Sequence, residues 1–165
     1  MVKVDYPDAD EEREILRRTT GGAGEQIQGV LDGEALHELQ EAVREVPVAD
    51  AVYDYALALT RSSRVGGDVS LDFIDQYVTW GAGPRASQYL ILGAKAHAAL
   101  QGRNHVSTED VRALAHPVLR HRILVNFTAQ AEGVDSDAII DRLLEHIQPG
   151  ADVGKGLPGL SEAAG

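Results

Sequence analysis

A glycine-rich turn that runs directly into a proline constrains the fold of this chain more than any other stretch. The turn is Trp80-Gly81-Ala82-Gly83-Pro84-Arg85-Ala86-Ser87. Pro84 suits a first helical position, because its missing N–H is not needed there and its fixed φ is already helical. The residues that follow are small or apolar around much of a helical surface. We therefore expect a central helix from Pro84 to about Leu100, buried on most sides by other helices.

Arg85 falls in the first turn of this helix, where a positive charge is locally unfavourable. The unpaired N–H groups and the helix dipole already make that end positive, and sequences normally place Asp, Glu, Ser or Thr there. Two positive sources converge beside glycines, which let another backbone approach closely. This combination indicates a site for an anion such as a phosphate. The alternative is an exposed Arg85 paired with one of the many nearby acids.

Gly and Pro divide the rest of the chain into segments with helical periodicity. We expect helices from Asp8 to about Arg18, from Asp32 to Pro47, from about Ala49 to Ser63, after Ser70, from Ser107 to Pro117, and after Ser136. The second of these has one apolar stripe that we expect to be buried: Ala35, Leu36, Leu39, Ala42, Val43 and Val46.

Three further residues carry predictions about packing. Gly93, inside the central helix, indicates a close helix crossing, and we expect Tyr77 and Trp80 in the core. No alternating pattern is strong enough to demand a sheet. The predicted fold class is therefore all-α, a compact bundle of about six to seven helices.

The composition is that of one domain of ordinary size. The chain has 165 residues, is 44% hydrophobic and contains no cysteine, which excludes disulfides and thiol catalysis. No apolar run approaches the ~20 residues that cross a bilayer, and the N-terminus is no signal peptide. We expect a cytoplasmic protein with no membrane span.

The charge of this chain is unevenly distributed. Its net charge of −11 argues against a nucleic-acid partner, because neutralisation of phosphates by Lys and Arg dominates that affinity. A superficial helix-turn-helix pattern over residues 84–116 does not outweigh this charge. Residues 85–122, however, carry six basic and only two acidic side chains. This basic segment either serves the anion site or packs against the acidic remainder.

A search for catalytic and metal-binding patterns finds none that holds. The run from Gly150 to Gly156 is one residue short of a phosphate loop and lacks its final Ser or Thr. The six histidines show no ligand spacing, so we expect no metal site. On its own, the chain is not expected to be an enzyme.

Several motifs in order resemble the C-terminal part of MoxR-type AAA+ ATPases. They are Tyr77 to Gln88, then Gly102-Arg103, Val106-Ser107 and Asp110-Val111, then Pro117 to Leu124. Val4-Asp5-Tyr6-Pro7 is similar to the link that leaves the ATPase core in that family, and Gln40 to Arg44 is similar to its lid. The resemblance covers about residues 2–147.

The resemblance implies a helical lid domain that senses bound ATP. Arg85 corresponds to the family's sensor-two residue, which reaches the terminal phosphates, and Gly83, Pro84 and Ala86 complete the nucleotide-binding motif. ATP and Mg²⁺ are then expected in the whole protein, with no tight binding by this chain alone. The implied partners are the protein's own ATPase core, neighbouring subunits of a hexameric ring, and a von Willebrand factor A-domain protein, in a chaperone-like role.

The chain departs from the family pattern because it has no phosphate loop, no acidic Mg²⁺ site and no arginine finger. We therefore expect a piece of a longer protein, with Met1 added. The expected boundaries are a lid over residues 1–148, of which 1–7 are the link, and a disordered Gly/Pro/Ala-rich tail over 149–165. The alternative is a free-standing acidic helical adaptor that binds a partner protein.

Overall fold

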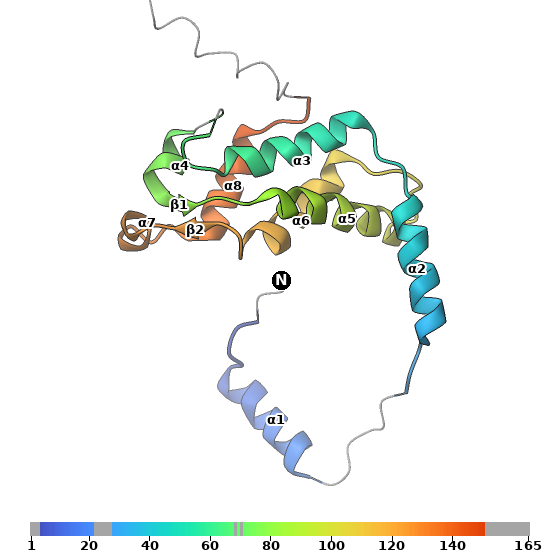
Figure 1. Cartoon of the computed structure of the whole chain (residues 1–165). Helices are drawn as coiled ribbons and strands as arrows, with labels where there is room; N and C mark the ends of the chain where they lie inside the picture. The colour runs from blue at the N-terminus through green and yellow to red at the C-terminus, as the bar shows by residue number, and fades with distance from the viewer. Residues whose placement is uncertain (1–3, 22–27, 68, 70, 151–165) are drawn as a thin grey trace, which may run out of the picture. The chain divides into compact units, whose positions relative to one another are not determined.

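A computed structural model describes residues 4–21, 28–67, 69 and 71–150, which form eight helices and two short strands (Figure 1). The elements are α1 (Ala9–Thr20), α2 (Gly33–Glu45), α3 (Asp50–Ser62), α4 (Asp72–Tyr77), β1 (Val78–Trp80), α5 (Pro84–Leu100), α6 (Thr108–Leu119), β2 (Leu124–Val125), α7 (Phe127–Ala131) and α8 (Ser136–His146). The all-α prediction is confirmed. Ser70, and the predicted tail from residue 151 onward, lie outside the described residues.

The chain divides into two compact units, residues 2–40 and the part from Glu41 onward. In the first unit, α1 begins with a capping box: the Asp8 carboxylate accepts from the Glu11 N–H at 2.9 Å, and Glu11 accepts from the Asp8 N–H. Asp32 caps α2 as predicted, accepting from the Ala35 N–H at 2.8 Å. The predicted starts of both helices follow from these local bonds.

The apolar stripe predicted to be buried along α2 is only partly covered: Ala35 and Val43 are half-buried, and Val46 packs against the core. None of the residues of α2 is buried, and Leu36 and Leu39 are 50% and 51% exposed. Periodicity identified the helix correctly, but it cannot say whether another element covers the apolar face.

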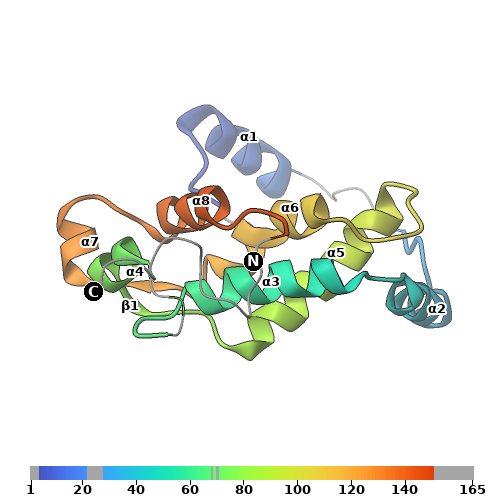
Figure 2. The ribbon, with the colours of Figure 1, turned by 90° about the horizontal axis from the view of Figure 1, so that it is seen from above.

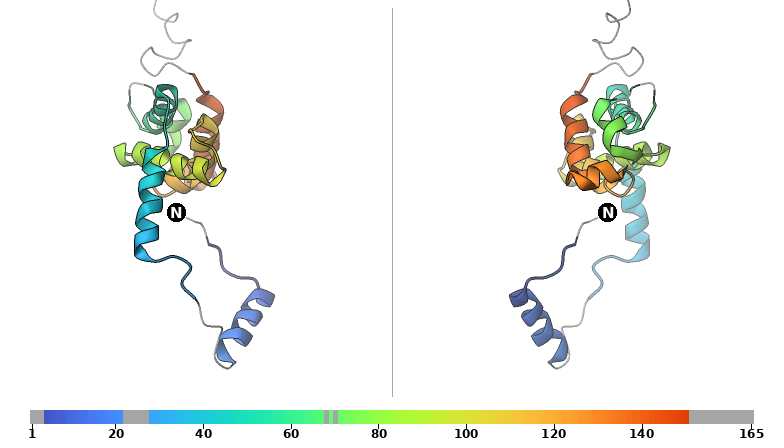
Figure 3. Two further views of the ribbon diagram at one scale, coloured as in Figure 1. Left: turned by 90° about the vertical axis from the view of Figure 1, so that its right-hand side faces the viewer. Right: turned by 90° about the vertical axis from the view of Figure 1, so that its left-hand side faces the viewer.

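The second unit is built around α5. This helix packs against α3 and α6, and α8 packs against α3 and α6 in turn (Figure 2). The end-on views show these helices side by side (Figure 3), and their buried side chains form one hydrophobic core. Its fully buried large apolar side chains are Leu59, Ile74, Leu90, Val111, Leu119, Ile139, Ile140 and Leu143.

One face of α5 is buried, rather than most of its surface. Ala86, Leu90, Ala94 and Ala98 are completely buried at a spacing of four residues, whereas other apolar positions are exposed. Most of the buried side chains are small, so neighbouring helices lie close to the α5 backbone. Gly93 confirms the predicted close crossing, because a Cβ there would lie 3.1 Å from the Leu114 side chain on α6.

Two predicted helix limits were wrong by a few residues. α6 continues through Pro117 to Leu119, since the buried Val118 and Leu119 hold its last turn on the core. This packing outweighs the backbone hydrogen bond that proline removes. α8 is capped by Asp135, whose carboxylate accepts from the Ala138 N–H at 2.9 Å, rather than by Ser136.

A buried carboxylate joins α5 to α6. Asp110 is fully buried and accepts hydrogen bonds from the Arg103 guanidinium, at 2.7 Å to one oxygen, and from the Ser107 N–H at 2.8 Å. Nδ1 of His97, near the end of α5, lies 2.6 Å from its other oxygen. The Arg103 bonds, helped by those of His97 and Ser107, hold the pKa of Asp110 far below its ordinary value.

Replacing this carboxylate is expected to destabilise the fold in a pH-dependent way. Asp110→Asn should lower the free energy of unfolding by about 2 kcal/mol at neutral pH, because Arg103 and the start of α6 lose a charged acceptor. Because the pKa of Asp110 is lower in the folded chain than in the unfolded chain, its charge stabilises the fold above about pH 4. This contribution is lost as the pH falls further. The gap between wild type and variant should therefore shrink between pH 7 and pH 2.5 in urea unfolding.

The matched control is Asp141→Asn, since Asp141 is 63% exposed and pairs with His116 at 3.1 Å. It should change the free energy of unfolding by less than about 0.5 kcal/mol. A gap for Asp110→Asn that is equally large at both pH values would contradict a role for the Asp110 charge.

Candidate functional site

The turn between β1 and α5 is fixed to the C-terminal end of α3. Gly81 lies so close to Ser63 that a Cβ added to it would come within 2.1 Å of the Ser63 carbonyl oxygen. The Ala82 N–H donates to Ser63 Oγ at 2.9 Å, and Arg64 Nε donates to the Ala82 carbonyl at 2.9 Å. These contacts set the position from which α5 begins.

The β1–β2 pairing holds the other end of this turn. Val78 pairs with Val125 and Trp80 with Leu124, antiparallel, with an irregularity between Val78 and Trp80. Such an irregularity turns the following side chain away from the face that regular alternation would give it. Val78 is buried, but Trp80 is 72% exposed. The prediction that Trp80 fills the core is therefore wrong, whereas the one for Tyr77 is confirmed.

A pocket of about 380 Å³ opens beside this turn. Arg64 and Val65, which follow the end of α3, line one part of it, and the rest of the wall runs along the turn from Thr79 to Pro84. Trp80 thus stands exposed at a hollow that ends at the residue before Arg85.

Arg85 is exposed in the first turn of α5, which contains no acidic residue. Within the part of the chain that the structure describes, its guanidinium makes no hydrogen bond or ion pair. The acid partner offered by the alternative interpretation is therefore absent among the described residues. Gly83 precedes Pro84 as the N-cap without a side chain, and a Cβ there would meet open space.

The other five cations of the basic segment 85–122 have partners inside the fold. The contacts are Lys95 with the Arg44 carbonyl (2.6 Å), Arg103 with Asp110, Arg112 with Tyr55 Oη (2.8 Å), Arg120 with Asp137 (2.7 Å), and Arg122 with the Val118 carbonyl and the Tyr89 ring. Among these contacts, packing against the acidic remainder holds for Arg120 alone, because Asp110 lies inside the basic segment and the other three cations bond to carbonyl, hydroxyl or aromatic groups. Arg85 differs from them because its guanidinium has no such partner among the described residues.

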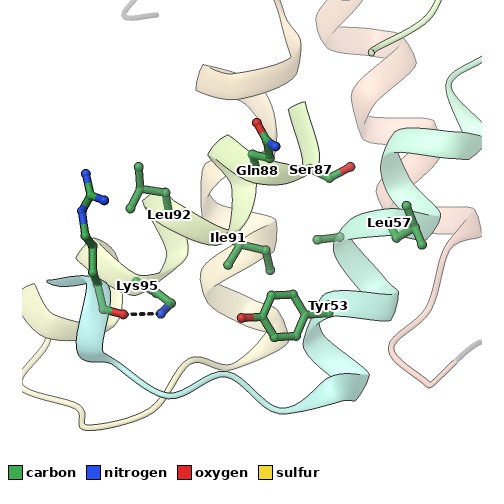
Figure 4. Close-up of a pocket in the computed structure, with 9 residues that line it drawn as sticks. Tyr53, Leu57, Ser87, Gln88, Ile91, Leu92 and Lys95 are labelled. Atoms are coloured by element: carbon green, nitrogen blue, oxygen red, sulfur yellow. Dashed lines mark hydrogen bonds between the residues drawn. The ribbon is translucent and has the colours of Figure 1, made fainter. Parts of the chain in front are cut away.

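A second hollow follows the same helix. An apolar groove of about 470 Å³ runs between α3 and α5, with Tyr53 and Leu57 on one wall and Ile91 and Leu92 on the other (Figure 4). Ser87 Oγ is buried in its wall without a hydrogen-bond partner among the described residues. Tyr53 and Leu57 are 46% and 40% exposed and line this groove.

No group of three His, Asp or Glu side chains in the described parts of the chain is arranged to hold a metal ion. Among the same residues, no helix is both long and apolar enough to span a bilayer.

Comparison with known proteins places these features in a family. The model of the AAA lid domain family matches residues 73–143, a range that contains β1, the turn and α5. Chaperone MoxR1 of Mycobacterium tuberculosis is 32% identical over 146 residues, covering 88% of this chain and 38% of that protein. Protein MoxR of Paracoccus denitrificans is 31% identical over 157 residues, covering 87% of this chain and 45% of that protein.

The chain belongs to the MoxR-type AAA+ lid domains. A crystal structure from Cytophaga hutchinsonii supports the same fold, with a TM-score of 0.76 and 28% identity over 88% of this chain and 44% of that one. This MoxR-type lid sequence therefore spans less than half the length of these relatives.

Sequence reasoning placed Arg85, Gly83, Pro84 and Ala86 together correctly at the start of α5, because a glycine before a proline marks a helix start locally. It missed the part of this MoxR-type lid that positions them. Ser63 and Arg64 are about 20 residues away in sequence, and nothing in their own neighbourhood indicates that they bind the turn. The two glycines in the turn were the only available signal of a close approach.

The close approach at Gly81 predicts that a side chain at this position will destabilise the fold, whereas one at Gly83 will not. Gly81→Ser should lower the free energy of unfolding by about 3 kcal/mol, because the new Cβ would overlap backbone atoms of Ser63 and Arg64. These atoms cannot shift without moving the chain around them. Gly83→Ser should be neutral or slightly stabilising, since serine is a good N-cap residue and its Cβ meets open space. Thermal and urea unfolding of this chain will measure both. Equal destabilisation of the two variants would contradict the close approach.

Proposed function

We propose that this chain is the nucleotide-sensing lid of a MoxR-type AAA+ ATPase, with Arg85 as the sensor-two residue. The observation that carries the proposal is the contrast within the basic segment. Five of its cations are held by groups inside the fold, whereas Arg85 projects from the first turn of α5 without a partner among the described residues. An unneutralised guanidinium at a positive helix end is suited to a polyphosphate supplied from outside this chain.

The residues around Arg85 favour the approach of phosphate oxygens. Gly83 has no side chain and leaves the surface before α5 open, and the Ala86 side chain is buried. Neither residue therefore covers the start of the helix. No carboxylate in the first turn competes with a phosphate. The guanidinium would donate hydrogen bonds to the terminal phosphate and stabilise the charge that develops there as it leaves.

The packing of α5 offers a route from this contact to the rest of the lid. α5 lies against α3 and α6, and Gly81 and Ala82 tie its start to the end of α3. A pull on Arg85 would therefore displace the helices as one body, rather than bend a loose loop. In this proposal, the nucleotide state is transmitted to neighbouring subunits by movement of the whole lid.

The wider setting of the proposal comes from the MoxR family. ATP and Mg²⁺ would be bound in the longer protein by an ATPase core, to which residues 1–7 are the link. The protein would form a ring, with a chaperone-like role and a von Willebrand factor A-domain partner. A free-standing adaptor is less well supported, because the lid-family match covers the very stretch that carries Arg85.

Substitution of Arg85 tests the proposal in the protein that joins this lid to its ATPase core. Arg85→Ala should lower kcat for ATP hydrolysis by about 100-fold, because a charge-stabilising donor is lost from the transition state. Arg85→Lys should recover only part of the rate, since an ammonium lacks the planar fork.

Gln88→Ala is the matched control, because Gln88 is exposed about one turn further along α5. It should hydrolyse ATP normally, and all three variants of the isolated chain should melt at the wild-type temperature. Normal turnover by Arg85→Ala would refute the sensor-two role.

A further inference from the structure

The apolar groove between α3 and α5 is separate from the proposed nucleotide site, since its lining includes neither Arg85 nor the turn before it. Its volume of about 470 Å³ lies in the range of small-molecule sites. Figure 4 shows Tyr53 and Leu57 on α3 facing Ile91 and Leu92 on α5. Three of these four side chains, those of Tyr53, Leu57 and Leu92, are between 40% and 46% exposed. Folding therefore leaves apolar surface of both helices open to water in this groove.

The charge along the groove is positive, although the whole chain carries a net charge of −11. Among the described residues, the charged side chains that line it are those of Arg44 and Lys95. Arg44 lies 3.6 Å from the Glu41 carboxylate, whereas Lys95 donates to the Arg44 carbonyl oxygen at 2.6 Å and pairs with no carboxylate in the described part of the chain. A neutral carbonyl leaves the ammonium charge uncompensated, and an ammonium has three N–H donors. Lys95 can therefore still bind an anion.

The rest of the groove offers few polar contacts to a ligand. Ser87 Oγ is covered by protein atoms, so its hydroxyl does not reach the open space. Gln88 is exposed and adds one neutral amide. Figure 4 places Lys95 at one end of the groove and Ser87 at the other. A matching ligand is therefore apolar along its length and anionic at the Lys95 end.

The length of the groove sets the size of this ligand. Ser87 and Lys95 are eight residues apart on α5, which is about 12 Å at the helical rise, or the length of an extended chain of about ten carbons. Each methylene that lies between the two helices is removed from water, which favours binding in proportion to the apolar area buried. A linear chain can follow such a groove between its two apolar walls.

We propose that the groove between α3 and α5 binds a straight-chain carboxylate of about ten carbons, with its carboxylate at Lys95 and its chain between the apolar walls. The ammonium donates charge-assisted hydrogen bonds to the carboxylate beside the bond that it already makes to the Arg44 carbonyl. This inference is independent of the proposed function, in which no residue of the groove contacts ATP.

Decanoate is the probe, and its binding to this chain can be measured by calorimetry and by shifts of amide resonances in NMR spectra. Decanoate should bind at one site, with the largest shifts at the residues of α3 and α5 that line the groove. Octanoate should bind about 15-fold more weakly, because two fewer methylenes are buried. Decyltrimethylammonium has the same chain length and the opposite charge, so it should bind more weakly than decanoate.

Substitutions at the charged end of the groove test the orientation of the ligand. Lys95→Met keeps an apolar stem but removes the charge, so it should weaken decanoate binding about tenfold. Lys95→Glu should reverse the preference, so that decyltrimethylammonium binds more tightly than decanoate. Thermal unfolding of both variants without ligand will check that the fold is retained.

A matched pair of leucines on α5 tests the apolar wall. Leu92→Gln should weaken the binding of both probes, because it places an amide against the hydrocarbon chain. Leu100→Gln is the control, since Leu100 is an 86% exposed leucine of the same helix that does not line the groove. It should bind decanoate as the wild type does.

Four outcomes would overturn the proposal. Equal affinity for decanoate and decyltrimethylammonium, unchanged by Lys95→Met, would indicate non-specific binding of a detergent. Amide shifts centred on Trp80 or Phe127 would place decanoate on another surface. Dimers that form through the groove and that decanoate does not dissociate would make a second copy the occupant. Loss of decanoate binding in the protein joined to its ATPase core would show that the core covers the groove. The role of Arg85 is judged separately, by ATP hydrolysis.

Discussion

The close approach of Gly81 to Ser63 is the contact on which the geometry of the lid depends. It brings the turn before α5 directly against the backbone at the end of α3, with no room for a side chain between them. Two hydrogen bonds, from the Ala82 N–H and from Arg64 Nε, then hold the turn in place. Because a buried backbone group must be paired, these bonds also satisfy polar groups that the turn would otherwise bury. The position from which α5 begins is thus set by tertiary contacts of the turn that precedes it.

This anchoring explains how one short segment can combine rigidity with exposure. Ala82 and Ala86 are buried on either side of Pro84, so the turn and the first turn of the helix are attached to the core. Trp80 and Arg85 project from the same few residues into solvent. A site that responds to a ligand needs this arrangement, because a side chain on a loose loop would move without carrying its helix along.

Electrostatics separates structural cations from the candidate functional one. Arg103 and Asp110 join the end of α5 to the start of α6, and Arg120 and Asp137 join α6 to α8. Each of these guanidinium groups has its carboxylate inside the fold, so its charge serves packing. The sequence sets Arg85 apart by its place at a helix start, but it does not show which of the six basic residues between positions 85 and 122 are paired inside the fold. Only the folded arrangement shows that Arg85, unlike the other five, has no partner among the described residues.

The sequence by itself determined the described helices other than α7, and most of their ends, because capping and helix periodicity act within a few residues. Asp8, Asp32 and Ser107 begin helices through bonds to backbone groups three positions away, and Pro84 begins α5 through its own fixed φ. The placement of Arg85 at a helix start followed from the same local rules.

The tertiary structure alone decided what covers each face. It exposed Trp80 through the irregular β1–β2 pairing, left Leu36 and Leu39 of α2 half exposed, and carried α6 past Pro117. These features depend on contacts between residues far apart in the chain, and apolar periodicity is the same whether or not a partner surface is present. The pocket beside Trp80 has the same origin, since its walls come from the end of α3 and the turn before α5.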